Sequence, residues 1–267
     1  NNFAGKVDAM IIGRTIGSSE LGEYFLAQRL MLVLPSLLNG ALDQVLLPAY
    51  SRLQGSPEKI ERAYWDSLVF SLLFTLPPVC LIFLFSDELV FLLYGSKWIN
   101  TAPLMKIMSI FAFASCLGGG IFGSALYSQG KPKAMTIVSA FRVIALPTCL
   151  LIGSTRGVSG IAWGFAIYGI IGRFFNQIVL RFSLGYPLAL FFRKISGPLV
   201  ASVFVTIVSI SVLDLVTSLG LSEVGGIIIK ILIGSLLWLV FYYLIVYILC
   251  RKDFIRFKEA IFSLKNV

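Results

Sequence analysis

Three arginines lie inside long apolar stretches of the sequence, where an ionised side chain is costly. Arg29 and Arg173 stand one or two helical turns inside their stretches, and Arg142 is about nine residues in, roughly 12 Å deep at the rise of an α-helix. The planar fork of guanidinium donors matches a phosphate group, so these residues could bind a phosphorylated substrate. The alternative is a structural ion pair, in which each arginine meets an acid on a neighbouring helix.

Polar neighbours extend two of these positions into helix faces. Arg29, Ser36 and Asp43 recur at seven-residue steps, and Asn39 lies close to the same face. In a later apolar segment Arg173, Asn176 and Gln177 share one side. We therefore predict a polar cavity, with Arg29, Arg142 and Arg173 contacting substrate and Ser36, Asn39, Asn176 and Gln177 in its wall.

Other charges near apolar stretches have simpler explanations. Lys106 and Lys230 lie near segment ends, from which a long side chain can reach water. Asp87 and Glu88 fall in a short polar break, where we expect hydration. For Asp8, a structural salt bridge and a role in binding a coupling ion are equally expected. Asp43 has the same two interpretations.

The residue inventory argues against several chemistries. The sequence has no histidine, and its four cysteines show no CxxC spacing, so we predict no metal site, cofactor or disulfide framework. No paired carboxylates lie in the apolar segments, so we expect no enzyme activity. The net charge of +9 is spread singly between apolar runs, which argues against a nucleic-acid partner.

Composition and apolar run length place these residues in a membrane. Only 13% of the 267 residues are charged and 58% are hydrophobic, half the charged share of a soluble domain. Runs of about 20 apolar residues, enough to cross a bilayer, predict an all-α transmembrane bundle of about eight helices. The expected segments are 3–17, 22–47, 65–94, 102–128, 134–153, 158–181, 198–219 and 226–250. Several are expected to be interrupted by Pro or Gly, at Pro35, Pro77, Pro78, Gly118, Gly119, Gly120 and Pro147, and such breaks commonly border a cavity in transporters.

Loop charges give the orientation. Thirteen lysines and arginines fall in the loops after the even segments and in the tail: Arg52, Lys59, Arg62, Lys131, Lys133, Arg181, Arg193, Lys194, Arg251, Lys252, Arg256, Lys258 and Lys265. The opposite loops hold Lys97 and Arg156, with Arg14 at a segment edge. Positive charge accumulates on the cytoplasmic side, so we predict a multi-pass protein of the cell inner membrane with a cytoplasmic C-terminus.

Four stretches in the same order resemble one family of transporters. These are DAMIIGRTIGSSELGEYFLAQRLMLVLP from Asp8, LLPAYSRLQGSPEKIERAY, LLYGSKWINTAPLMKIMSI and SALYSQGKPK. They resemble the second half of polysaccharide flippases, of the Wzx and teichuronic-acid types, in the multidrug/oligosaccharidyl-lipid/polysaccharide (MOP) superfamily. The likeness extends over residues 5–190, and its motif positions are Asp8, Arg14 and Arg29.

The resemblance implies two six-helix lobes that face each other across a cavity. Residues 1–182 would form the second lobe with a truncated first helix, 183–197 a cytoplasmic linker, 198–250 two additional helices, and 251–267 a cytoplasmic amphipathic tail. The implied substrate is an undecaprenyl-pyrophosphate-linked oligosaccharide, moved by alternating access, with Arg14 joining the substrate-binding arginines. The implied partners are this substrate, the bilayer and an N-terminal half of the same protein.

Two other functions remain open. A cation-coupled multidrug exporter of the same superfamily would be expected to carry more acids than bases in the lobe, whereas bases dominate here. A membrane-embedded polysaccharide polymerase usually needs a large outer loop, and the connections expected here are about ten residues or fewer.

Overall fold

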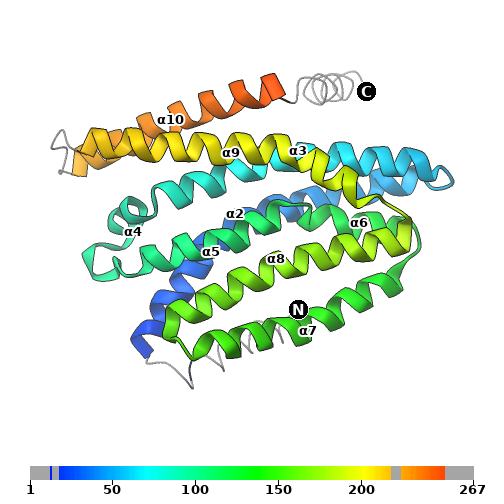
Figure 1. Cartoon of the computed structure of the whole chain (residues 1–267), viewed down its shortest axis with the longest axis horizontal. Helices are drawn as coiled ribbons and strands as arrows, with labels where there is room; N and C mark the ends of the chain where they lie inside the picture. The colour runs from blue at the N-terminus through cyan, green and yellow to red at the C-terminus, as the bar shows by residue number, and fades with distance from the viewer. Residues whose placement is uncertain (1–12, 14–17, 218–223, 250–267) are drawn as a thin grey trace.

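The computed structural model describes residue 13 and residues 18–217 and 224–249, and these form a bundle of long helices (Figure 1). The elements are α2 (Ser18–Arg52), α3 (Pro57–Leu84), α4 (Ser86–Tyr94), the 3₁₀ turn η1 (Ser96–Trp98), α5 (Thr101–Cys116), α6 (Gly119–Ser128), α7 (Pro132–Ser154), α8 (Gly157–Leu184), α9 (Leu188–Thr217) and α10 (Val224–Leu249). The described residues contain no strand. The predicted all-α architecture is confirmed.

Seven helical stretches in the described residues are long and apolar enough to cross a membrane. They match the second to eighth expected segments, because α5 and α6 together make one stretch, Thr101–Ser128. The first expected segment, 3–17, and the tail, 251–267, lie outside the described residues apart from Gly13. The chain is therefore a multi-pass membrane protein.

Two boundaries differ from the sequence expectation. The segment expected at 65–94 is α3, which already begins at Pro57, followed by the short α4. The linker expected at 183–197 is mostly helix, since α9 begins at Leu188 and continues through Pro198. The stretch from Leu188 holds strong helix formers and no glycine until Gly197, so its charges at Arg193 and Lys194 do not interrupt the helix.

Glycine, rather than proline, breaks a helix in the middle of this bundle. Pro35, Pro77, Pro78 and Pro147 all lie within continuous helices. Gly118, by contrast, has φ +91° and separates α5 from α6, a left-handed conformation that favours glycine. A Cβ at this position would also lie 3.0 Å from Leu68 Cδ1, so the break is packed against α3.

The helices share one large core and one smaller one. The large core joins α2, α3, α5, α6 and α8 around Tyr24, Tyr64, Leu68, Met108 and Phe165. The smaller core packs α9 and α10 on α3 through Val69, Leu73, Val205, Trp238 and Tyr242, and this pair forms one side of the bundle in Figure 1, with α7 on the other. Large aliphatic side chains on the outer faces of α7, α9 and α10 are exposed, as expected of surfaces that contact lipid.

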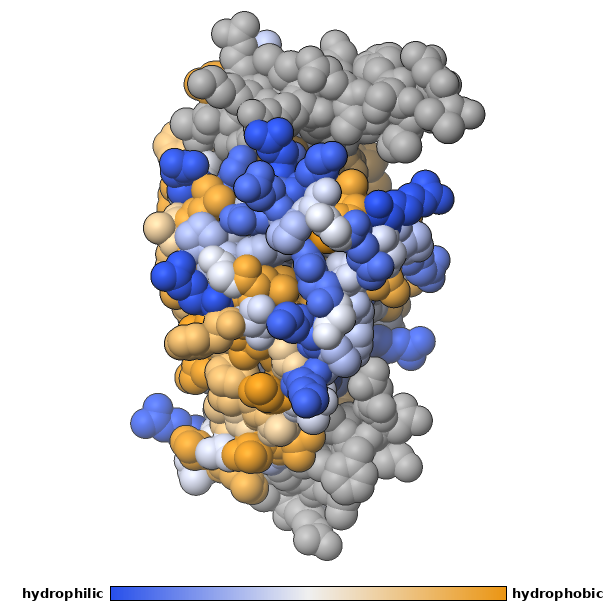
Figure 2. Space-filling view, turned by 90° about the vertical axis from the view of Figure 1, so that its right-hand side faces the viewer, coloured by the Kyte–Doolittle hydropathy of each residue, from blue (hydrophilic) through white to orange (hydrophobic). Residues whose placement is uncertain are grey.

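The cationic connections gather at one end of the bundle. The α2–α3, α6–α7 and α8–α9 connections lie at the right-hand end of Figure 1, and Figure 2 shows hydrophilic side chains concentrated there. Gln54 Nε2 donates to the Ser128 carbonyl at 2.7 Å and ties two of these connections together. The α3–α4, α4–α5 and α7–α8 connections lie at the opposite end.

Candidate functional site

A cavity of about 480 Å³ opens between α2, α5, α6, α7 and α8. Its polar lining consists of Gln28, Arg142, Tyr168, Arg173 and Asn176. The apolar lining is largely aromatic, with Phe111, Phe122, Phe141 and Phe165 among its side chains. Among the described lining residues there is no acid, so the cavity carries two fixed cations and no fixed anion. It is suited to an anionic ligand with apolar surfaces.

Helix α7 brings Arg142 to the cavity through helical periodicity. Met135, Val138, Arg142 and Leu146 stand three or four residues apart, and all line the cavity. The Arg142 side chain is exposed and forms no ion pair or hydrogen bond within the described residues. Its donors are therefore available to a ligand.

The spacing between α7 and α8 is set by glycine at one end and by aromatic rings at the other. A Cβ at Gly160 would lie 2.2 Å from the Gly153 carbonyl oxygen, and one at Gly164 would lie 2.3 Å from the Cys149 carbonyl oxygen. Further along, Phe141 and Phe175 stack with their ring centroids 4.0 Å apart. The helices thus touch through backbone near their loop, while side chains hold them apart beside the cavity.

Arg173 is anchored where a helix ends. Its Nε–H donates to the Ala114 carbonyl at 3.0 Å, in the last turn of α5 and just before the break at Gly118. The same carbonyl accepts the Leu117 N–H at 3.1 Å, so the guanidinium adds a second, positively charged donor at the C-terminus of α5, where the helix carries a partial negative charge. Its Nη1 is buried without a hydrogen-bond partner in the described structure. The partner expected for Arg173 was a phosphate or an acid, and this backbone carbonyl is neither.

The neighbouring residues Asn176 and Gln177 separate. Asn176 lines the cavity, whereas Gln177 is buried and lies outside the lining. Consecutive side chains point about 100° apart around a helix, so the adjacent amides of Asn176 and Gln177 do not both face the cavity. Gln177 Nε2 and the Tyr64 hydroxyl oxygen are both buried, and neither has a hydrogen-bond partner among the described residues.

The polar face predicted on α2 is directed away from this cavity. Arg29 is exposed and is not among the lining residues, and the Ser36 hydroxyl donates to the Val33 carbonyl at 2.8 Å. Asp43 instead accepts a 2.8 Å hydrogen bond from the Ser124 hydroxyl of α6. Beside it, a Cβ at Gly120 would lie 2.6 Å from the Asn39 carbonyl oxygen, so α2 and α6 pack backbone to backbone.

Of the predicted arginines, Arg142 and Arg173 therefore share one cavity, and Arg29 lies elsewhere. Asp8 and Arg14 lie outside the described residues. Gln28 was not predicted, and it reaches the cavity from the face of α2 next to Arg29. Its signal in the sequence was only an amide within an apolar stretch, because the packing of α2 decides that the face shared by Gln28 and Leu32 meets the cavity.

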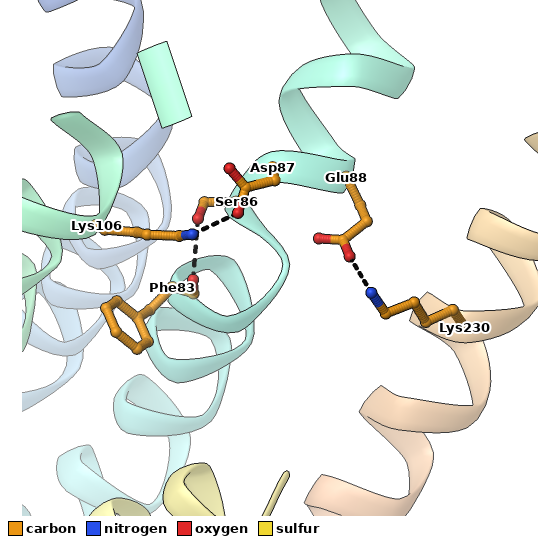
Figure 3. A network of polar contacts seen from close by, with 6 residues as sticks. All are labelled: Phe83, Ser86, Asp87, Glu88, Lys106 and Lys230. Atoms are coloured by element: carbon orange, nitrogen blue, oxygen red, sulfur yellow. Dashed lines mark hydrogen bonds and ion pairs between the residues drawn. The ribbon is translucent and has the colours of Figure 1, made fainter. Parts of the chain in front are cut away.

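Two ion pairs at the end opposite the cationic connections correct the expectation for four charges. Lys106 binds Asp87, and Lys230 Nζ lies 2.5 Å from Glu88 Oε1 (Figure 3). The lysines were expected to reach water and the acids to be hydrated. Segments that end on the same side of a membrane place opposite charges at one depth, where they pair rather than remain separately solvated.

Comparison with known proteins gives matches of one kind. A family model described as "Polysaccharide biosynthesis protein" matches residues 1–103. Lipopolysaccharide biosynthesis protein WzxC of Escherichia coli (strain K12) is 23% identical over 175 residues, which are 65% of this chain and 35% of that protein. Teichuronic acid biosynthesis protein TuaB of Bacillus subtilis (strain 168) is 20% identical over 213 residues, 79% of this chain and 44% of that protein. The chain thus spans less than half the length of these relatives.

A solved structure has the same fold. The lipid II flippase MurJ, in an inward closed conformation, superposes with a TM-score of 0.66 at 19% sequence identity. The superposition covers 89% of this chain and 49% of that chain.

Proposed function

We propose a transport function from one premise: this chain is a relative of the polysaccharide flippases of the MOP superfamily. The chain forms one lobe of an alternating-access transporter, and this transporter moves a lipid-linked oligosaccharide across a bilayer. The substrate we assign is an undecaprenyl-pyrophosphate-linked oligosaccharide, and the membrane is the bacterial inner membrane with the C-terminus in the cytoplasm. The lysines and arginines of the connections at one end of the bundle support that orientation, and Figure 2 shows the hydrophilic surface of this end.

One observation carries this proposal, the cationic cavity within the bundle. Arg142 and Arg173 line it, and its described lining offers no carboxylate that would neutralise them. A pyrophosphate supplies the missing negative charge and matches guanidinium donors. Arg142 has all its donors available, whereas Arg173 has already committed Nε to α5. Arg142 is therefore the primary pyrophosphate contact, and Arg173 supports it from a fixed position.

The exposed polar face of α2 supports a second lobe. Arg29, Ser36 and Asp43 are all exposed on a helix that otherwise has the length and hydropathy of a membrane span. Charged side chains are costly in lipid, and neither Arg29 nor Asp43 forms an ion pair within the described residues, so we assign this face to an aqueous space shared with the other half of the transporter.

A cation-coupled drug exporter is the second candidate in the same fold. It requires a carboxylate to attract cationic drugs or a coupling cation. The described cavity lining has none, and the exposed Asp43 on α2 already binds Ser124. The charge balance of this cavity therefore favours an anionic substrate.

The test is polysaccharide export in a flippase-null strain that receives this chain together with the other lobe of the transporter, measured beside the membrane abundance of each variant. Arg142→Ala should abolish export at normal abundance, and Arg142→Lys should retain part of it, since the charge remains but the planar fork is lost. Arg156→Ala is the matched control, because Arg156 is an exposed arginine at the α7–α8 loop outside this cavity. Normal export by Arg142→Ala would refute the site, and an equal loss of abundance would make Arg142 structural.

A further inference from the structure

The described polar groups in the cavity fall into two chemical classes. Arg142 and Arg173 only donate hydrogen bonds, which suits the oxygens of a phosphate. Gln28 and Asn176 carry amides, and each amide both donates and accepts. A fully ionised phosphate offers no donor to an amide carbonyl, so the two amides exceed what pyrophosphate recognition needs.

Neither amide is used by the protein itself. The side chains of Gln28 and Asn176 form no hydrogen bond within the described residues, and both are only partly exposed. They approach the cavity from different helices, Gln28 from α2 and Asn176 from α8. Two unpaired amides at the wall of a membrane-embedded cavity indicate a ligand with hydroxyl or amide groups.

The aromatic side chains of the cavity offer a surface on which the apolar C–H groups of such a ligand could pack. Phe111 of α5 stacks on two rings of α8, Phe165 and Tyr168, with ring centroids 4.1 and 6.2 Å away. Phe141 stacks on Phe175 at an interplanar angle of 12°, which occupies one of its faces. Phe141 lines the cavity and Phe175 does not. A ring presents a partly negative face, which attracts polarised C–H groups.

We propose that this cavity binds a sugar residue of the substrate, next to the pyrophosphate. Gln28 and Asn176 recognise its hydroxyl groups, and Phe141 packs against its apolar C–H face. A pyranose ring combines a polar rim with apolar faces, and a cavity of about 480 Å³ has the volume for one or two such rings beside a phosphate. This inference rests on the proposed function and adds sugar recognition to it.

The probes are farnesyl pyrophosphate and farnesyl-pyrophosphoryl monosaccharides, and binding is measured by calorimetry on the protein in nanodiscs. The best sugar-bearing probe should bind the unmodified protein about tenfold more tightly than farnesyl pyrophosphate, because the amides gain partners. Gln28→Leu and Asn176→Leu should each remove most of this increment, so each should weaken binding of the sugar-bearing probe more than binding of farnesyl pyrophosphate. Asn176→Ala repeats the test without added bulk. Gln44→Leu, an exposed glutamine on the same helix outside the cavity, is the control and should retain the increment.

Two outcomes would overturn the inference. Equal affinity of the unmodified protein for all probes would refute sugar recognition, and it would leave the proposed function intact if Arg142→Ala still weakened pyrophosphate binding. A sugar increment that survives in Gln28→Leu and in both Asn176 variants would place the sugar elsewhere. If farnesyl pyrophosphate binds no better to the unmodified protein than to Arg142→Ala, the proposed pyrophosphate site fails first.

Discussion

The ion pair between Glu88 and Lys230 joins the α9–α10 pair to the rest of the bundle, and we expect its loss to be measurable. Glu88 lies in the first turn of α4 and Lys230 lies in α10, with their charged atoms 2.5 Å apart. Their side chains are only 16% and 14% exposed. On the same helix, Asp87 pairs with Lys106, but those side chains are 49% and 40% exposed. The two pairs in Figure 3 therefore differ mainly in burial and form a matched comparison.

Burial decides the expected magnitude. Removing one partner of a fully buried pair costs about 3–5 kcal/mol, because the other charge stays desolvated. Exposed pairs contribute about 0–1 kcal/mol. Glu88 and Lys230 are largely but not fully buried, so Glu88→Gln and Lys230→Met should each lower the free energy of unfolding by about 2 kcal/mol. Asp87→Asn should lower it by about 0.5 kcal/mol. For a chain of this size these costs correspond to a fall in Tm of roughly 4–8 °C and 1–2 °C.

The assay is a thermal melt of the detergent-solubilised protein, followed by size-exclusion chromatography with fluorescence detection. The double variant Glu88→Gln/Lys230→Met should be more stable than the sum of the two single losses predicts, since neither charge is then left alone. The swap Glu88→Lys/Lys230→Glu should recover part of the stability. Equal losses for Glu88→Gln and Asp87→Asn, or additive losses in the double variant, would refute the argument from burial.

Further predictions concern orientation, helix packing and the α5 cap. In a cysteine-free background, cysteines at Ser56 and Thr155 should be labelled from opposite sides of the membrane, and labelling of both from one side would reject the proposed topology. Gly160→Ala should lower the melting temperature by several degrees because its Cβ would lie 2.2 Å from a backbone oxygen, whereas Gly225→Ala, with open space around it, should not. Arg173→Met should reduce both membrane abundance and export, because it removes the cap of α5, whereas Arg142→Ala should reduce export alone. Normal membrane abundance of Arg173→Met would show that the cap is dispensable.

The sequence alone was sufficient for the class of fold and for the positions of the spans. Apolar runs of about 20 residues and alternating loop charge are properties of single segments, so they can be recognised without knowing how the helices pack. Of the interruptions expected at Pro and Gly, the one at Gly118 separates two helices, whereas Pro35, Pro77, Pro78 and Pro147 lie within continuous helices. Depth within a span also singled out Arg142 and Arg173, which the structure places at one cavity.

Tertiary structure decided what each polar group contacts. Arg29 and Arg173 look alike as deep arginines, yet one is exposed on α2 and the other caps α5, because rotation of each helix about its axis is fixed only by neighbouring helices. The same holds for Asn176 and Gln177, adjacent in sequence but directed to a cavity and to a packed core. The pairing of Glu88 with Lys230, 142 residues apart, depended on how α10 docks on the bundle. Hydropathy reports whether a helix crosses the membrane, and only packing determines which neighbour each of its faces meets.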